Sequence, residues 1–321
     1  MEIMKKLGAF IVPTGVGASV GGFAGDASRA ARKISQKCEL IVNPNVVNAA
    51  CFSGINENML YVEGYSLDRF FKGEICLEHS NNNKTGIIFD KAIKPEVLNV
   101  HINTMNAVEV VYGLNIIGYE ITEEEVGVDF FVDSTGVSMG NVKNLLTLKK
   151  AAEKLIERGA EAIAIVCRFP DEQGDDYANG VGVDPVGGVE AIISHYISKE
   201  FSIPCAHAPA FDNIQIETDI VDKRCSAEYI TPTFLPCILI GLNQAPKLTK
   251  TGLSVENLDF VVVPYNSIGG IPVLEAAKRG IKVYAVKENQ TVLDVTPMNF
   301  LNTCDIINTY DELYYKLMEI Y

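Results

Sequence analysis

Four polar side chains in the second half of the sequence could carry acid–base chemistry or bind an anion. Cys205 and His207 end a short apolar segment, and alternation along a strand would place both on one face. A thiol or imidazole there could act as an acid, a base or a nucleophile. Arg168 follows an apolar run and could bind a carboxylate or phosphate. Asp184 precedes a Gly-Gly pair, where it could position a substrate hydroxyl or simply form a turn.

A glycine-rich segment near the start of the chain could bind an anion through its backbone. Residues 10–26 begin apolar, become rich in glycine and lead into residues 27–34, an order that predicts strand, loop and helix. Backbone N–H groups of such a loop can approach an anion, with the positive end of the helix behind them. The predicted anion-binding residues here are Thr14, Gly15, Gly17, Gly21, Gly22 and Asp26.

Two standard phosphate-binding motifs are absent from this segment. Its glycines lack the Gly-x-Gly-x-x-Gly spacing of dinucleotide-binding loops, and no Walker Lys-Ser/Thr follows them. An NTPase is therefore not predicted, and no motif indicates an organic cofactor.

Apolar–Gly–Gly–apolar turns recur at residues 20–23, 186–189 and 268–271, each before a predicted helix and strand. In a parallel sheet, the loops after those strands would gather at the carboxyl edge, where ligands bind. Close packing of helix on strand is the alternative reason for each Gly-Gly pair. Further candidate substrate-binding residues in such loops and turns are Asn43, Asn45, Glu63, Arg69, Gly187, Gly188, Asn266, Gly269 and Gly270.

An acidic run after Arg168 could bind a divalent cation together with His207. The carboxylates concerned are Asp171, Glu172, Asp175, Asp176 and Asp184. Their spacing matches no regular metal motif, and an exposed acidic loop is the alternative. No metal ligand is assigned, and a divalent metal stays open.

The eight cysteines include no Cys-x-x-Cys pair, so a zinc ribbon is not indicated. Most have apolar neighbours, which fits reduced, buried thiols of a cytoplasmic protein. A different chemistry would use Cys51, Cys205 or Cys237 in a cofactor-free isomerase or lyase.

The composition limits the classes of protein and of partner that fit this sequence. The 321 residues are 48% hydrophobic and 21% charged, with a formal net charge of -14 and a pI near 4.8. This acidity argues against a nucleic-acid partner, because phosphate backbones are bound mainly by Lys and Arg. No apolar run approaches the roughly 20 residues that span a bilayer, so we expect a cytoplasmic protein without a membrane segment. The apolar surplus is compatible with a homo-oligomer.

Short apolar runs alternate with helical segments, which predicts an α/β fold. We expect a largely parallel sheet with helices on both faces in Rossmann-like layers, and glycine-rich loops at its carboxyl edge. Residues 1–321 would form a single α/β unit, with a subdomain boundary at the charged turn near residues 122–126. Strands are predicted at 7–12, 39–42, 59–62, 86–90, 116–121, 128–132, 162–166, 203–206, 259–263 and 282–286.

Seven stretches resemble an uncharacterised family called domain of unknown function 3326. They lie at residues 13–26, 43–48, 61–70, 168–171, 182–188, 204–209 and 233–237. They extend over nearly the whole chain, and the resemblance implies no reaction.

A second, partial resemblance concerns residues 184–191, the predicted helix after them and residues 203–206. This part is similar to the nicotinate-nucleotide:dimethylbenzimidazole phosphoribosyltransferases. That likeness implies an α/β fold and phosphate handling, but the Gly-Glu-Gly-Thr-Gly-type catalytic loop of those enzymes is absent here.

Together these features predict a metabolic enzyme that binds a small phosphate- or carboxylate-bearing metabolite, nucleotides included. Group transfer is the favoured reaction class. His207 would be the acid–base residue, with Asp184 and Cys205 as further catalytic candidates, Arg168 as the anion clamp and residues 14–26 as the cradle. The alternatives are the Cys/His isomerase or lyase and a non-catalytic small-ligand-binding protein.

Overall fold

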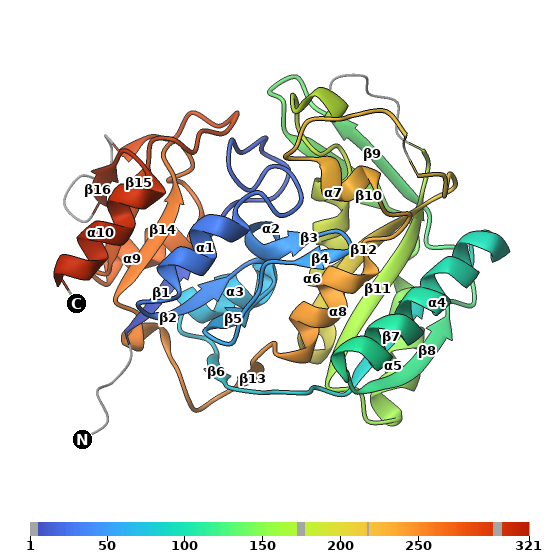
Figure 1. Cartoon of the computed structure of the whole chain (residues 1–321). Helices are drawn as coiled ribbons and strands as arrows, with labels where there is room; N and C mark the ends of the chain where they lie inside the picture. The colour runs from blue at the N-terminus through green and yellow to red at the C-terminus, as the bar shows by residue number, and fades with distance from the viewer. Residues whose placement is uncertain (1–5, 172–176, 217, 298–303, 321) are drawn as a thin grey trace.

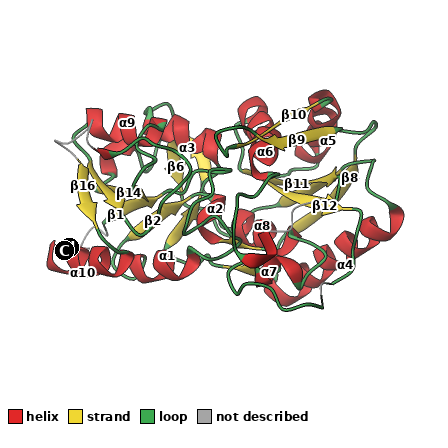
Figure 2. Ribbon diagram, turned by 90° about the horizontal axis from the view of Figure 1, so that it is seen from above, coloured by secondary structure: helices red, strands yellow, loops and turns green. Residues whose placement is uncertain are grey.

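Two parallel β-sheets lie side by side, and helices cover both faces of each (Figure 1, Figure 2). The computed structural model describes residues 6–171, 177–216, 218–297 and 304–320. The arrangement confirms the predicted α/β class, with two parallel sheets where one was expected. In the described part of the chain, no helix combines the length and apolarity needed to cross a bilayer.

The larger sheet has six strands in the order β16-β15-β14-β1-β2-β5, and every neighbouring pair is parallel. Its strands are β1 (Leu7–Phe10), β2 (Glu39–Val42), β5 (Met59–Tyr61), β14 (Phe260–Pro264), β15 (Lys282–Val286) and β16 (Cys304–Ile307). The order reverses between β1 and β14, and such a reversal opens a crevice at the carboxyl ends of the strands. The glycine-rich loop follows β1 directly, so it begins at this crevice.

The smaller sheet has four parallel strands in the order β12-β11-β7-β8. They are β7 (Thr85–Phe89), β8 (Ile116–Ile121), β11 (Ala162–Phe169) and β12 (Cys205–Phe211). Its helices are α4 (Pro95–Tyr112), α5 (Leu145–Glu157), α6 (Gly187–Phe201) and α8 (Leu235–Asn243). The central strand β11 is apolar and almost wholly buried, as a strand covered on both faces should be.

Helices of the larger sheet lie on both of its faces (Figure 2). They are α1 (Ser28–Ile34), α3 (Gly64–Phe71), α9 (Ile271–Lys278) and α10 (Tyr310–Ile320). One hydrophobic cluster includes Phe10 of the larger sheet, Val166 of the smaller sheet and Leu239 of α8. A continuous core therefore joins the two sheets.

Short elements complete the chain and link the sheets. The antiparallel pair of β6 (Cys76–Glu78) and β13 (Lys247–Thr249) lies where the chain passes from the larger sheet to the smaller one and back (Figure 1). The other elements are α2 (Pro44–Val47), α7 (Ser226–Tyr229), the pair β3 (Asn48–Ala49) and β4 (Phe52–Ser53), the hairpin β9 (Val128–Val132) and β10 (Ser138–Val142), and 3-10 turns at Tyr177–Asn179 and Val255–Asn257.

Two strands extend beyond their predicted ends. The strand predicted at residues 203–206 is β12, which runs from Cys205 to Phe211, so His207 lies within the strand rather than after it. Pro209 suggested a loop, but β12 is an edge strand, where a missing N–H is tolerated. The strand predicted at 162–166 likewise continues to Phe169.

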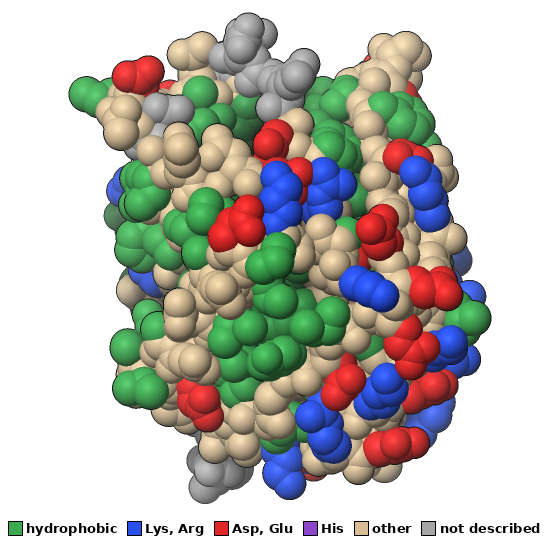
Figure 3. All heavy atoms as spheres, turned by 90° about the vertical axis from the view of Figure 1, so that its right-hand side faces the viewer, with side chains coloured by type: hydrophobic (Ala, Val, Ile, Leu, Met, Phe, Trp, Pro, Cys, Tyr) green, Lys and Arg blue, Asp and Glu red, His purple; other side chains and the backbone are tan. Residues whose placement is uncertain are grey.

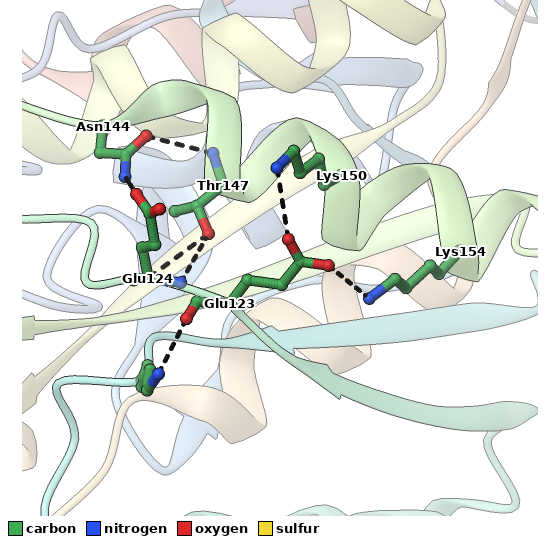
Figure 4. Close-up of polar contacts among 7 residues, drawn as sticks. Glu123, Glu124, Asn144, Thr147, Lys150 and Lys154 are labelled. Atoms are coloured by element: carbon green, nitrogen blue, oxygen red, sulfur yellow. Dashed lines mark hydrogen bonds and ion pairs between the residues drawn. The ribbon is translucent and has the colours of Figure 1, made fainter.

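The charged turn near residues 122–126 connects β8 to β9 and is fixed to α5 (Figure 4). The Glu123 carboxylate accepts hydrogen bonds from Lys150 and Lys154 at 3.3 and 3.1 Å. The backbone N–H of Glu124 donates to Thr147 Oγ1 at 3.1 Å. These contacts tie the turn to the smaller sheet's own helix, and a subdomain boundary there stays a prediction.

Candidate active site between the two sheets

A cavity of about 370 Å³ lies at the carboxyl ends of strands from both sheets. The larger sheet contributes residues that follow β1 and β2, and the smaller sheet contributes the end of β12 and the loops around α6, α7 and α8. Its volume falls in the range of about 300–1,000 Å³ that is usual for small-molecule sites. Thr14, Gly15, Gly17, Gly21, Gly22, Asn45, Asp184 and His207, all predicted from the sequence, line this cavity.

The first half of the glycine-rich loop, Thr14–Ala18, has the backbone properties of an anion cradle. Gly15 and Gly17 have φ of +70° and +56°, which favours glycine at both positions. The carbonyl of Gly15 accepts from Ser138 N–H at 2.8 Å, which fixes the loop on β10. Among the described residues, none of the five successive N–H groups of Thr14–Ala18 has a hydrogen-bond acceptor. Consecutive amides with alternating left-handed residues are typical of anion-binding loops.

The second half of the loop is closed by Asp26. Its carboxylate accepts the Gly21 N–H at 2.6 Å, and burial raises its pKa to about 6. A Cβ at Gly22 would lie 2.1 Å from the carbonyl oxygen of Ala18, so the turn requires glycine there. Asp26 does not line the cavity. Its contacts are those of a residue that shapes the loop.

Glu228 belongs to α7 and lines the cavity. Its side chain lies against the glycine-rich loop that follows β1. Its Oε1 accepts hydrogen bonds from Ala24 N–H at 2.8 Å and from Tyr177 O–H at 3.0 Å. Burial raises its pKa to about 8; the charges of Asp184 and Asp26 add to this, and the two hydrogen bonds oppose it. Oε2 has no hydrogen-bond partner among the described residues.

A carboxyl group with a pKa near 8 is protonated in most molecules at neutral pH and can donate its proton. Sequence reasoning missed Glu228, because it lies in a short helix with no motif around it. Only the fold brings it to a loop about 200 residues earlier in the chain.

Asp184 lies just before α6 and also lines the cavity. Its Oδ1 accepts Val186 N–H at 3.1 Å, and the Gly187 N–H also bonds to the carboxylate. Burial nevertheless raises the pKa of Asp184 above its ordinary value. The sequence left two alternatives for Asp184, a turn residue or an acid that faces a substrate. In the structure Asp184 forms the turn and also lines the cavity.

The Gly187-Gly188 pair at the start of α6 brings the helix close to its neighbours. A Cβ at Gly188 would lie 2.2 Å from the carbonyl oxygen of Ser138, and the Gly188 N–H donates to Ser138 Oγ at 3.0 Å. Neither glycine lines the cavity. Close packing, the alternative reading of this pair, accounts for both.

His207 faces α6 from β12. Its Nδ1 lies 2.8 Å from Ser194 Oγ, and that hydroxyl donates to the Ala191 carbonyl at 3.4 Å. Nε2 lies 3.7 Å from the Glu190 carboxylate. Burial and neighbouring His195 lower the pKa of His207 to about 3. At neutral pH this imidazole is therefore uncharged, with one ring nitrogen that donates and one that accepts a hydrogen bond.

The candidate cysteines lack the environment of a reactive thiol. Cys205 is buried in the core, where burial raises its pKa well above the ordinary value. Cys237 lines the cavity, but burial raises its pKa to about 12. Burial also raises the pKa of Cys51. Thiolate chemistry needs a lowered pKa, so the geometry does not favour the isomerase or lyase alternative.

Two predicted anion-binding arginines do not line the cavity. Arg168 forms a two-point ion pair with Asp212, with nitrogen–oxygen distances of 3.1 and 2.6 Å. Arg69 contacts Glu74 at 3.4 Å and Ser202 Oγ at 3.4 Å. Both guanidinium groups have protein partners away from the cradle.

Other predicted binding residues have structural roles outside the cavity. Glu63 caps α3 by accepting the N–H groups of Tyr65 and Ser66, both at 2.7 Å. Asn43 bonds both backbone groups of Val12, with its Oδ1 at 3.0 Å from the N–H and its Nδ2 at 2.7 Å from the carbonyl.

The third Gly-Gly turn also lies away from the cavity. The Asn266 side chain donates to the carbonyls of Thr291 and Leu293, at 2.8 and 2.5 Å. Gly269 and Gly270 form the entrance to α9. The turns at 20–23 and 186–189 both reach the cavity, through Gly21, Gly22 and Val186, whereas the turn at 268–271 does not.

Three of the carboxylates considered for a divalent cation, Glu172, Asp175 and Asp176, lie outside the described residues. Within the ranges that are described, no three His, Cys, Asp or Glu side chains are placed to hold a metal ion. The question of a divalent metal stays open.

The fold and cavity define a two-sheet α/β protein with a metabolite-sized site at its carboxyl edges. The family model for a protein of unknown function, DUF3326, matches residues 8–316, and the chain belongs to this family. An uncharacterised lipoprotein of Synechococcus sp. is 41% identical over 300 residues, which are 90% of this chain and 83% of that protein. No solved structure matches the chain. The likeness to phosphoribosyltransferases stays a prediction.

Proposed function

We propose that the protein is an enzyme acting on a small phosphate- or carboxylate-bearing metabolite, with group transfer as its reaction class. The anionic group would bind the amides of Thr14–Ala18, and the reacting group would lie against Glu228. The observation that carries this proposal is the run of five amides, without acceptors among the described residues, in one cavity with a carboxyl group whose pKa is about 8.

The acid–base role moves from His207 to Glu228 in this proposal. A general acid works best when its pKa lies near the working pH. The Glu228 pKa is about 8, whereas that of His207 is about 3. Glu228 would exchange a proton with the reacting oxygen or nitrogen, and the uncharged His207 imidazole would hydrogen-bond a ligand hydroxyl.

Location and assembly remain proposals as well. The dispersed cysteines and the absence of a long apolar run favour a cytoplasmic protein, whereas a relative bears the name lipoprotein. Figure 3 shows hydrophobic side chains gathered on the face at the right of Figure 1, with charged groups around them. Helix α4, on that side, exposes Val110, Val111 and Tyr112 at its last turn. Such a surface is compatible with a homo-oligomer.

A thermal-shift screen against sugar phosphates, nucleotides and organic acids, with and without Mg²⁺, tests the proposal. We expect a bound anion to raise the melting temperature, and Gly17→Ala to abolish that rise by displacing the cradle. Gly280→Ala is the matched control, since Gly280 has φ of +70° and no atom within 4 Å of its Cβ position.

Both glycine variants should lose about 1–2 kcal/mol of stability, because each places a side chain in the left-handed region. Only Gly17→Ala should lose binding. The proposal fails if no anion binds, or if Gly17→Ala and Gly280→Ala retain equal affinity. Binding without turnover of any ligand would favour the non-catalytic alternative.

A further inference from the structure

The side chains that line the cavity are strongly unbalanced in charge. Among the described lining residues are four carboxyl groups, and there is no lysine or arginine. The carboxyl groups belong to Asp171, Asp184, Glu190 and Glu228. An anionic ligand held by backbone amides would therefore face acids and no cationic side chain of the described lining.

Two of these acids lie at the two ends of the glycine-rich loop. The Asp184 carboxylate and the Thr14 methyl group lie 3.2 and 3.1 Å from the Cβ position of Gly187, so Asp184 is beside the start of the cradle. Glu228 is bonded to Ala24 at the other end of the loop. Both carboxyl groups line the same cavity as the Thr14–Ala18 amides.

The two carboxyl groups interact electrostatically, because the negative charge of Asp184 raises the pKa of Glu228. A positive group between them would remove that conflict, because an opposite charge nearby favours ionised carboxylates. An ammonium group offers three N–H donors, and ionised carboxylates offer only acceptors. A hydroxyl group could pair with one acid but would leave the charge unbalanced.

We propose that the ligand is zwitterionic, with a phosphate or carboxylate on the Thr14–Ala18 amides and, a few atoms away, an ammonium group between Asp184 and Glu228. This inference rests on the proposed function, and it narrows the substrate class to amino acids, amino-sugar phosphates and related amines.

Matched ligand pairs that differ only in amine against hydroxyl test the inference. Suitable pairs are O-phosphoserine with 3-phosphoglycerate, and glucosamine 6-phosphate with glucose 6-phosphate. By isothermal titration calorimetry we expect the amine to bind at least tenfold more tightly in one pair. Glu228→Gln should reduce the ratio of amine affinity to hydroxyl affinity. Gly17→Ala should instead weaken the binding of both ligands of a pair.

Proton release provides a second readout. Ionisation of Glu228 by the ammonium group should release protons at pH 7, measured from titrations in buffers of different ionisation enthalpy. Equal affinities within both pairs, still abolished by Gly17→Ala, would overturn the zwitterion inference and leave the anion site standing. If the hydroxyl ligands bind as tightly as the amines once Mg²⁺ is added, the zwitterion inference is overturned in favour of a metal ion at this position. If none of the four ligands binds, the zwitterion inference is also overturned. The thermal-shift screen then tests the proposed function separately.

Discussion

The backbone N–H of Ala24 donates a hydrogen bond to Glu228 Oε1 at 2.8 Å. This contact joins the glycine-rich loop of the larger sheet to α7, which belongs to the chain around the smaller sheet. It holds an acid with a raised pKa next to the segment proposed to bind an anion. In the proposed function, this relationship supplies the cavity with both its binding element and its proton donor.

Glu228 should make stability depend on pH. Its pKa rises from 4.5 to about 8 on folding, so the native state keeps a proton that the unfolded chain loses between those values. Stability contributed by the protonated group is therefore lost as pH rises from about 4.5 to 8. Glu228→Gln does not titrate, and its advantage over the wild type should grow by up to about 1.4 kcal/mol per pH unit in that window.

Chemical denaturation at pH 5, 6, 7 and 8 measures this difference. Glu153→Gln, on the exposed side of α5, is the control and should follow the wild type. A difference between Glu228→Gln and wild type that stays constant with pH would contradict a Glu228 that keeps its proton in the folded protein.

Asn43 should be needed for folding rather than for ligand binding. Its amide pairs with both backbone groups of Val12 at 6% exposure. Asn43→Asp would set a carboxylate oxygen against the Val12 carbonyl, and we expect a loss of about 2–3 kcal/mol. Asn106→Asp, exposed on α4, is the control. An Asn43→Asp variant with normal stability but weakened ligand binding would restore the sequence prediction.

The cysteines should react slowly in the native protein. Cys205 and Cys237 are buried, and burial raises the pKa values of Cys51, Cys205 and Cys237. Iodoacetamide at pH 7.5, followed by mass spectrometry, should label these three much more slowly than in the unfolded chain. Fast native labelling of any of them would revive the thiol-based alternative.

Arg168 should contribute to stability and not to anion affinity. Its guanidinium is paired with Asp212 at the surface, so Arg168→Met should cost about 0.5–1 kcal/mol. The dissociation constant of any ligand found in the screen should stay within about twofold. A tenfold weaker affinity would show that Arg168 leaves Asp212 to bind the anion.

The local parts of the fold were readable from the sequence. The strands Ile116–Ile121 and Val128–Val132 occur as predicted, because each is an apolar run with a glycine shortly before it. The hairpin strand Ser138–Val142 was missed, since its glycine and polar residues indicate a loop and only pairing with Val128–Val132 makes it a strand.

Some residues of the candidate site could likewise be predicted from the sequence, and others could not. Thr14–Gly22, Asp184 and His207 were found through glycine content and position after apolar runs, and they do meet in one cavity. Arg168 was misplaced because the sequence does not reveal its partner Asp212. Glu228 was missed because long-range packing alone creates its environment.

The most direct test of the account follows glycine amide resonances by NMR while inorganic phosphate is titrated. The account predicts that the ¹⁵N–¹H signals of Gly15 and Gly17, assigned through their alanine variants, shift together and saturate. Signals of Gly113 and Gly280, which have positive φ but lie outside the cavity, should not move. Absence of a saturable shift at Gly15 and Gly17, or equal shifts at all four glycines, would contradict an anion cradle in this loop.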